Sequence, residues 1–139
     1  MGVDIHTQIF AKTETGWEEL KVYAMVNGKM EDRTGYAPYN DRNYDLFDVL
    51  EGLDCRGMWE DMPAESKAYH LYEGDYWTYK HSWFDWCELV ALAKTDEALD
   101  YEGENLLAPW IDQMRFVLEI YGLWYVKPGE VMVCIAFDC

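Results

Sequence analysis

The chain has 139 residues and carries 27 Asp and Glu against 11 Lys and Arg, a formal net charge of -16. Half of its residues are apolar and 17% are aromatic, which excludes a disordered acidic tail and predicts one folded domain over residues 1–139. Such a negative surface repels nucleic acid and anionic membranes, and it attracts basic surfaces.

The N-terminal part of the chain predicts a β-hairpin. Apolar and polar residues alternate over residues 3–10, which is the period of a strand. A turn at residues 12–16 leads into a second strand over residues 17–26, and Asn27-Gly28 offers a further turn. Residues 29–39 lose this periodicity, and we expect a loop there.

Helical spacing dominates most of the remaining chain. Four helices are predicted: residues 41–53 capped by Asn40 or Asp41, residues 64–72 opened by Pro63, residues 82–93 capped by Ser82, and residues 107–121 closed by Gly122. The densest acidic run, Asp96 to Glu104, precedes the last helix. An apolar strand over residues 131–137 ends the chain, and we expect it to be central in its sheet.

The order of these elements predicts an α+β fold. The N-terminal hairpin and the C-terminal strand form a small antiparallel sheet, and three to four helices pack against one face of it. No internal repeat, low-complexity segment or linker divides the sequence.

The cysteines and the N-terminus bear on the cellular compartment. The four cysteines follow no zinc-ligand spacing, and Met1 is not followed by a basic and apolar leader. We expect reduced thiols in an intracellular protein, with Cys87 and Cys134 buried and inert. No apolar run approaches the length of a membrane span.

Several short motifs occur in a characteristic order. These are Asp4-Ile5-His6, Arg42-Asn43-Tyr44-Asp45-Leu46-Phe47, Arg56-Gly57, His81-Ser82-Trp83 and Ala136-Phe137-Asp138. Together they resemble a family of small, functionally uncharacterised phage and bacterial proteins that open with Met-Gly-x-Asp-Ile-His. The sequence departs from that pattern at Met58-Trp59, where the family has Leu-Pro, and at the single His81, where a His-Ser-His pair is usual. The resemblance implies a phage or prophage setting, and therefore the cytoplasm of a bacterial host.

A metal centre is one candidate site. Asp4 and His6 are two residues apart on a predicted strand, so their side chains share a face. With His81 and Asp138 brought close by the fold, they could bind a divalent metal ion and activate a water molecule. The alternative is that Asp4 and His6 hydrogen-bond to each other and to neighbouring loops. Structural histidines of that kind are more common, and the departure at His81 also weighs against a metal.

Other ligand-binding patterns are weaker. Arg42 stands at a predicted helix start and could hold a phosphate, but pairing of Arg42 with a nearby carboxylate is favoured. No nucleophile motif, phosphate-binding loop or dinucleotide fingerprint occurs. We therefore expect no cofactor, with a divalent metal ion as the alternative.

The acidic residues are the favoured site. Carboxylates on a rigid scaffold can imitate the phosphates of nucleic acid and bind the basic groove of another protein. The aromatic residues from Tyr69 to Tyr79 either add contact area to such an interface or form a second small core. The predicted partner-binding residues are Glu73, Asp75, Tyr76, Trp77, Asp96, Glu97, Asp100, Glu102 and Glu104.

The sequence thus favours a binding protein over an enzyme. We expect a phage-encoded inhibitor of a bacterial defence system, anti-CRISPR-like or of another anti-defence kind, that binds a basic nucleic-acid-binding surface of a host protein. Direct binding to nucleic acid or membrane is not expected, and a homodimer remains open. The alternative is a metal-dependent hydrolase or nucleotide-handling enzyme that uses Asp4, His6 and His81.

Overall fold

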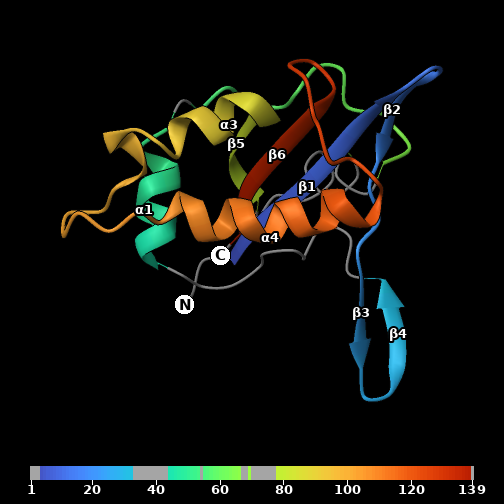
Figure 1. The fold of residues 1–139 in the computed structure, drawn as a ribbon, viewed down its shortest axis with the longest axis horizontal. Coiled ribbons are helices and arrows are strands. Elements are labelled where there is room, and N and C mark those ends of the chain that lie inside the picture. The colour runs from blue at the N-terminus through green and yellow to red at the C-terminus, as the bar shows by residue number, and fades with distance from the viewer. Residues whose placement is uncertain (1–3, 33–43, 54, 67–68, 70–77, 139) are drawn as a thin grey trace.

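The computed structural model describes residues 4–32, 44–53, 55–66, 69 and 78–138 (Figure 1). These residues form a mixed α+β fold, as the sequence predicts. The elements are β1 (Asp4–Thr13), β2 (Gly16–Glu19), β3 (Tyr23–Val26), β4 (Lys29–Asp32), α1 (Tyr44–Glu51), β5 (Thr78–Asp85), α3 (Trp86–Leu92), the 3-10 helix η1 (Asp96–Ala98), α4 (Leu107–Ile120) and β6 (Val131–Asp138).

A four-stranded antiparallel sheet with the strand order β2-β1-β6-β5 forms the centre of the fold. β1 and β2 make the predicted N-terminal hairpin. β6 pairs with β1 from Asp138 opposite Asp4 to Val131 opposite Ala11, and it pairs with β5 on its other side. The prediction that the C-terminal strand is central is therefore confirmed.

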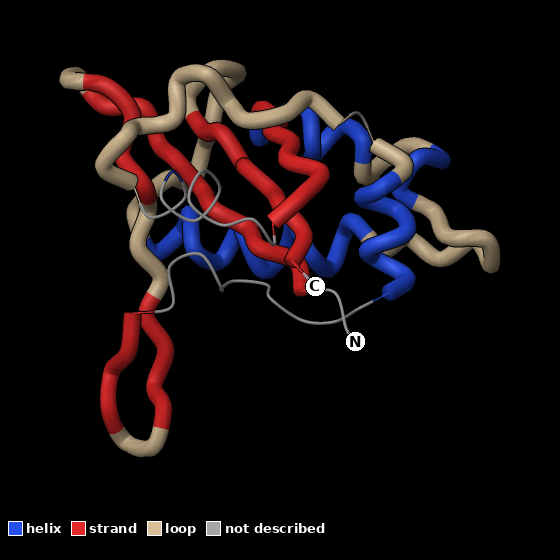
Figure 2. Tube along the Cα trace, turned by 180° about the vertical axis from the view of Figure 1, so that it is seen from behind, coloured by secondary structure: helices blue, strands red, loops and turns tan. Residues whose placement is uncertain are grey.

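The two faces of the sheet belong to two different cores. The odd-numbered residues of β6 lie in the larger core, to which α1, α3 and α4 contribute. Met132, Cys134 and Ala136 lie in a smaller core together with Phe10 and Trp59. Figure 2 shows the strands in front of the helices when the molecule is seen from behind, so the helices cover one face and loops cross the other.

The predicted second strand is divided in the structure. β2 ends at Glu19, whereas residues 23–26 form β3, which pairs with β4 in a separate two-stranded sheet. Asn27 and Gly28 have φ angles of 51° and 78° and make the turn between them, as the Asn-Gly pair predicts. The predicted loop is wrong for residues 29–32, which form β4, and residues 33–39 lie outside the described residues. This hairpin projects from the body of the molecule (Figures 1 and 2).

The helix predicted to begin at Ser82 begins at Trp86 instead. Residues 78–85 form the strand β5, and Asp85 is the N-cap of α3, because its carboxylate accepts a hydrogen bond from Cys87 N at 2.9 Å. The hydroxyl of Ser82 accepts a hydrogen bond from Arg56 N at 3.2 Å. Ser82 and Asp85 have the spacing of a capping box, but pairing with β6 extends the backbone there.

The end of α4 agrees with the prediction. Gly122 has a φ of 75°, and its N–H donates to Glu119 O at 3.0 Å. Leu123 N donates to Leu118 O at 2.9 Å, which completes a Schellman motif. Within the described ranges, none of the helices combines the length and the apolar content that crossing a bilayer requires.

The prediction of a helix over residues 64–72 is only partly covered. Residues 64–66 form a turn and Tyr69 is helical, while the other residues of that range lie outside the described residues. The caps predicted for the first helix, Asn40 and Asp41, also lie outside them.

Candidate acidic binding site

The predicted acidic run folds into η1 and a closed loop. The hydroxyl of Thr95 caps η1 by accepting a hydrogen bond from Glu97 N at 3.3 Å. In the loop, Asp100 Oδ1 accepts hydrogen bonds from Glu102 N and Glu104 N at 2.8 and 2.9 Å. Asp100 therefore shapes the loop that carries two other predicted carboxylates.

Helix α1 brings two further carboxylates to this run. Asp45 and Asp48 line a pocket of about 440 Å³ together with Asp96, Glu97 and Asp100. We name this the acidic pocket. Its lining contains five carboxylates and no Lys or Arg among the described residues. The remaining lining residues are Val49, Gly52, Leu53, Leu99 and Tyr101.

The acidic pocket combines charge with apolar contact area. Val49 and Leu53 are the buried apolar residues of its lining, whereas Tyr101 in the same lining is 90% exposed. Asp45 and Glu97 are also exposed. A cationic side chain entering this pocket can therefore reach carboxylates while its aliphatic part contacts apolar groups.

Asp45 and Asp48 were not among the predicted site residues. They are three apart on one helix and therefore share a face, which is a signal that the sequence contains. That this face meets Asp96 and Glu97, about fifty residues later, depends on the packing of α1 beside η1, which no local pattern reveals.

The other predicted partner-binding residues have different outcomes. Glu102 and Glu104 are exposed in the same loop but do not line the acidic pocket. Glu73, Asp75, Tyr76 and Trp77 lie outside the described residues, as does Arg42. Within the aromatic segment, Tyr69 packs against the smaller core, in keeping with the second-core interpretation at that position.

The acidic surplus is not confined to this one place. Glu18, Glu19 and Glu65 line a second pocket of about 480 Å³, on the β2 side of the sheet. Lys21 also lines that pocket, so its charge is partly offset. The acidic pocket differs in having carboxylates alone as its charged lining residues.

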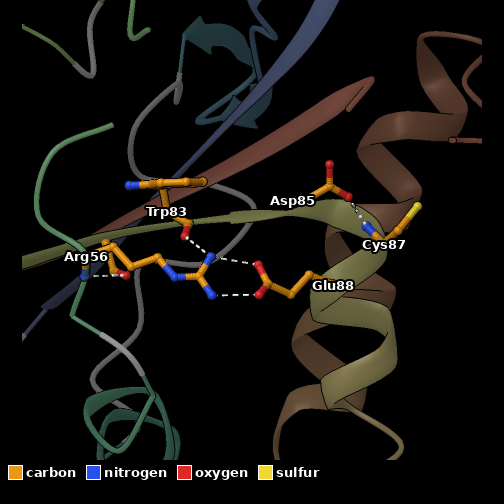
Figure 3. Close-up of polar contacts among 6 residues, drawn as sticks. Arg56, Trp83, Asp85, Cys87 and Glu88 are labelled. Carbon is orange, nitrogen blue, oxygen red and sulfur yellow. Dashed lines mark hydrogen bonds and ion pairs between the residues drawn. The ribbon is translucent and has the colours of Figure 1, made fainter. Parts of the chain in front are cut away.

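Arg56 joins strand β5 to helix α3 (Figure 3). Its guanidinium donates two hydrogen bonds to Glu88, at 2.7 and 2.6 Å, and a third to Trp83 O at 3.2 Å. It also lies over the ring of Phe84, 4.7 Å from the centroid. A pocket of about 460 Å³ touches Arg56 and Glu88 and adjoins the acidic pocket through Glu97. Because Glu88 already matches its charge, Arg56 adds little positive potential to the acidic pocket.

The contact with Arg56 makes the stability of the fold sensitive to pH through Glu88. The hydrogen bond from Arg56 lowers the pKa of the Glu88 carboxyl, and partial burial opposes this. A carboxyl with a lowered folded-state pKa stabilises the fold above its unfolded-state pKa, and this contribution is lost as the pH falls through the folded-state value.

We therefore expect Glu88→Gln to destabilise the protein more at about pH 7 than at about pH 4. The difference in free energy of unfolding between the two proteins, measured by urea denaturation across this pH range, should narrow as the solution is acidified. A difference that stays constant with pH would contradict the proposed role of the ionised carboxylate.

The predicted metal-ligand residues lie on adjacent strands at one end of the sheet. The register of β1 with β6 places Asp4 opposite Asp138 and His6 opposite Ala136. His81 lies in β5, at the irregularity where its register against β6 shifts. The backbone positions of the four residues are thus brought to the same region, as the hypothesis requires.

The side chains that are described there do not form a recognisable metal centre. His6 is buried, with 2% of its surface exposed, and burial lowers the pKa of His81. Among the described residues, no group of three or more His, Cys, Asp or Glu is arranged to hold a metal ion. The metal centre stays a prediction, carried by the register alone.

The two cysteines expected to be buried differ. Cys134 is fully buried in β6, and this burial raises the pKa of its thiol well above the usual range, so the thiolate is suppressed. The expectation is wrong for Cys87, which is only half-buried because it lines an open pocket beside the loop after α4.

Comparisons of the chain with protein-family models, with curated proteins and with solved structures find no match.

Proposed function

We propose that this protein is an acidic inhibitor that binds the basic, nucleic-acid-binding surface of a host protein, with the acidic pocket as its point of contact. The observation that supports this most strongly is the meeting of α1 with η1. It gathers five carboxylates around one pocket in a chain of net charge -16.

Electrostatics favours a cationic partner for this pocket. A concave surface lined by charges of one sign focuses the field and raises the rate of encounter with an oppositely charged surface. Lys and Arg side chains that normally contact phosphates would meet carboxylates here. Tyr101 and Leu99 supply apolar contact beside them, which charge alone would lack.

The identity of the partner is proposed from the resemblance to phage proteins. In a phage setting the partner would be a bacterial defence protein in the host cytoplasm, and blocking its nucleic-acid-binding surface would protect the phage genome. We expect neither nucleic acid nor membrane to bind directly, because both are anionic.

Neutralising the acidic pocket should abolish most of this binding. The variant Asp45→Asn/Asp48→Asn/Asp96→Asn/Glu97→Gln keeps side-chain size while removing four charges. We expect it to bind a lysine-rich decapeptide at least about tenfold more weakly than the native protein at low salt, because several cation–carboxylate contacts are lost. Calorimetric titration at low and high salt measures both the affinity and its salt dependence.

The matched control removes four exposed carboxylates elsewhere, as Glu14→Gln/Glu18→Gln/Glu60→Gln/Glu65→Gln. This variant has the same net charge, and we expect a much smaller loss of affinity. Equal losses in the two variants would show that total charge rather than the acidic pocket binds the peptide.

The host partner can then be sought by affinity capture from a bacterial lysate. A partner captured by the native protein at low salt, released by high salt and displaced by nucleic acid would support inhibition at a nucleic-acid-binding surface. A partner that nucleic acid does not displace would contradict it.

A metal-dependent hydrolase or nucleotide-handling enzyme is the second candidate. The observation that favours it is the register of the strands. Asp4 lies opposite Asp138, and His6 and His81 lie on β1 and β5, the two strands that flank β6. Elemental analysis of the purified protein distinguishes the two candidates. Stoichiometric zinc, manganese or iron that is lost in His6→Ala would favour the enzyme.

A further inference from the structure

A different pocket, of about 420 Å³, lies between α3, the end of α4 and the loop that connects α4 to β6. Figure 1 shows α1 beside the start of α4, whereas this pocket is lined by Arg115 and Leu118 in the second half of α4. We name it the aromatic pocket. Its volume falls within the roughly 300–1,000 Å³ range of small-molecule sites in proteins.

One part of the lining of the aromatic pocket is apolar. Trp86 and Leu118 belong to the larger core and form its buried side, and Val90 and Leu123 are half-buried. Trp124 is 66% exposed, so a large aromatic surface is left open to solvent here.

The loop that lines the pocket is held by hydrogen bonds to α4 and to α3. The Schellman motif at the end of α4 fixes the position of Leu123. The Cys87 thiol donates a hydrogen bond to Val126 O at 3.3 Å, which ties the loop to α3. These two hydrogen bonds position Leu123 and Val126 in the lining.

The charge of the aromatic pocket is opposite to that of the whole chain. Its charged lining residues are Arg115 and Lys127, without any Asp or Glu in the lining. Asp112 Oδ1 lies 3.8 Å from Arg115 Nη1, a long contact between side chains that are about half or more exposed, and it offsets part of the Arg115 charge. Asp85 lies close by, and its two carboxylate oxygens accept hydrogen bonds from the backbone N–H groups of Cys87 and Gly129.

We infer that the aromatic pocket binds a small amphipathic anion, an aromatic body that carries a carboxylate or a phosphate group. The body would pack against Trp86 and Trp124, and the anionic group would lie toward Arg115 and Lys127. Charge complementarity supports this class of ligand. In a chain with 27 acidic and 11 basic residues, this lining contains two cations and neither Asp nor Glu, so it is complementary to an anion.

Two dyes with the same aromatic body test this inference. The probe 8-anilinonaphthalene-1-sulfonate carries one negative charge, and N-phenyl-1-naphthylamine carries none. We expect the native protein to bind the sulfonate dye more tightly. Arg115→Gln/Lys127→Gln should weaken the sulfonate dye at least about fivefold and leave the uncharged dye within about twofold, as expected for loss of the charge contacts alone.

The control pair Lys29→Gln/Lys94→Gln removes the same charge from exposed positions outside the pocket and should leave both affinities nearly unchanged. Val90→Phe should fill the pocket and weaken the binding of both dyes.

Competition provides a second test. Benzoate and phenyl phosphate should each displace the sulfonate dye, and the more effective competitor identifies the anionic group of the ligand. Equal weakening by the two double variants, or tight dye binding in a folded Val90→Phe protein, would overturn the inference.

Discussion

Phe84→Ala is expected to lower the free energy of unfolding by about 3–5 kcal/mol, which is the usual cost of truncating a buried phenylalanine. Phe84 is 1% exposed and lies on β5 opposite Val133, within the larger core. The guanidinium of Arg56 lies over the Phe84 ring. Removing the ring leaves a cavity between the sheet and the helices and deprives Arg56 of this contact. Urea denaturation followed by circular dichroism measures the loss.

Phe116→Ala is the matched control for this truncation. Phe116 is 64% exposed on α4, so the same chemical change removes little buried surface, and we expect an effect within about 0.5 kcal/mol. Similar losses at the two positions would mean that β5 does not lie in the core as described.

Arg56→Ala should destabilise the protein by about 2–3 kcal/mol, because it removes charge-assisted hydrogen bonds and leaves a carboxylate without its partner. The arginine and Glu88 side chains are 25% and 37% exposed, so solvent offsets part of the loss. Thermal and urea denaturation both report this change. Arg115→Ala provides the control, since its contact with Asp112 is long and exposed, and we expect at most about 0.5 kcal/mol there.

Arg56→Lys separates charge from geometry. Lysine keeps the positive charge but cannot donate two parallel hydrogen bonds to one carboxylate or stack a planar group on Phe84. We expect it to recover less than half of the stability lost in Arg56→Ala. Full recovery would show that the charge alone is sufficient.

Local sequence signals predict those elements whose burial pattern is visible within one stretch of chain. The apolar stripe of α4 and its terminal Gly122 specify that helix within one stretch of chain, and the structure agrees. β6 was recognisable because its two faces are both buried, which gives a continuous apolar run. In both cases the apolar residues that form the sequence pattern are the residues that are buried in the structure.

Predictions failed where a distant partner decides the outcome. Ser82 and Asp85 match a helix start, yet hydrogen bonding to β6 makes this segment a strand. The acidic pocket has the same origin, since Asp45 and Asp48 meet η1 only through tertiary packing. The run from Asp96 was identified from the sequence, but its partners on α1 were not.

The hydrogen bonds of Arg56 and Gly57 give two of the short sequence motifs a structural role. Gly57 N donates to His81 O at 2.8 Å, and Arg56 hydrogen-bonds to Ser82 Oγ through its backbone and to Trp83 O through its side chain. The Arg-Gly and His-Ser-Trp motifs thus fasten one chain segment to another. Two of the three acceptors are backbone carbonyls, so this junction depends on the path of β5 more than on the side chains of His81 and Trp83.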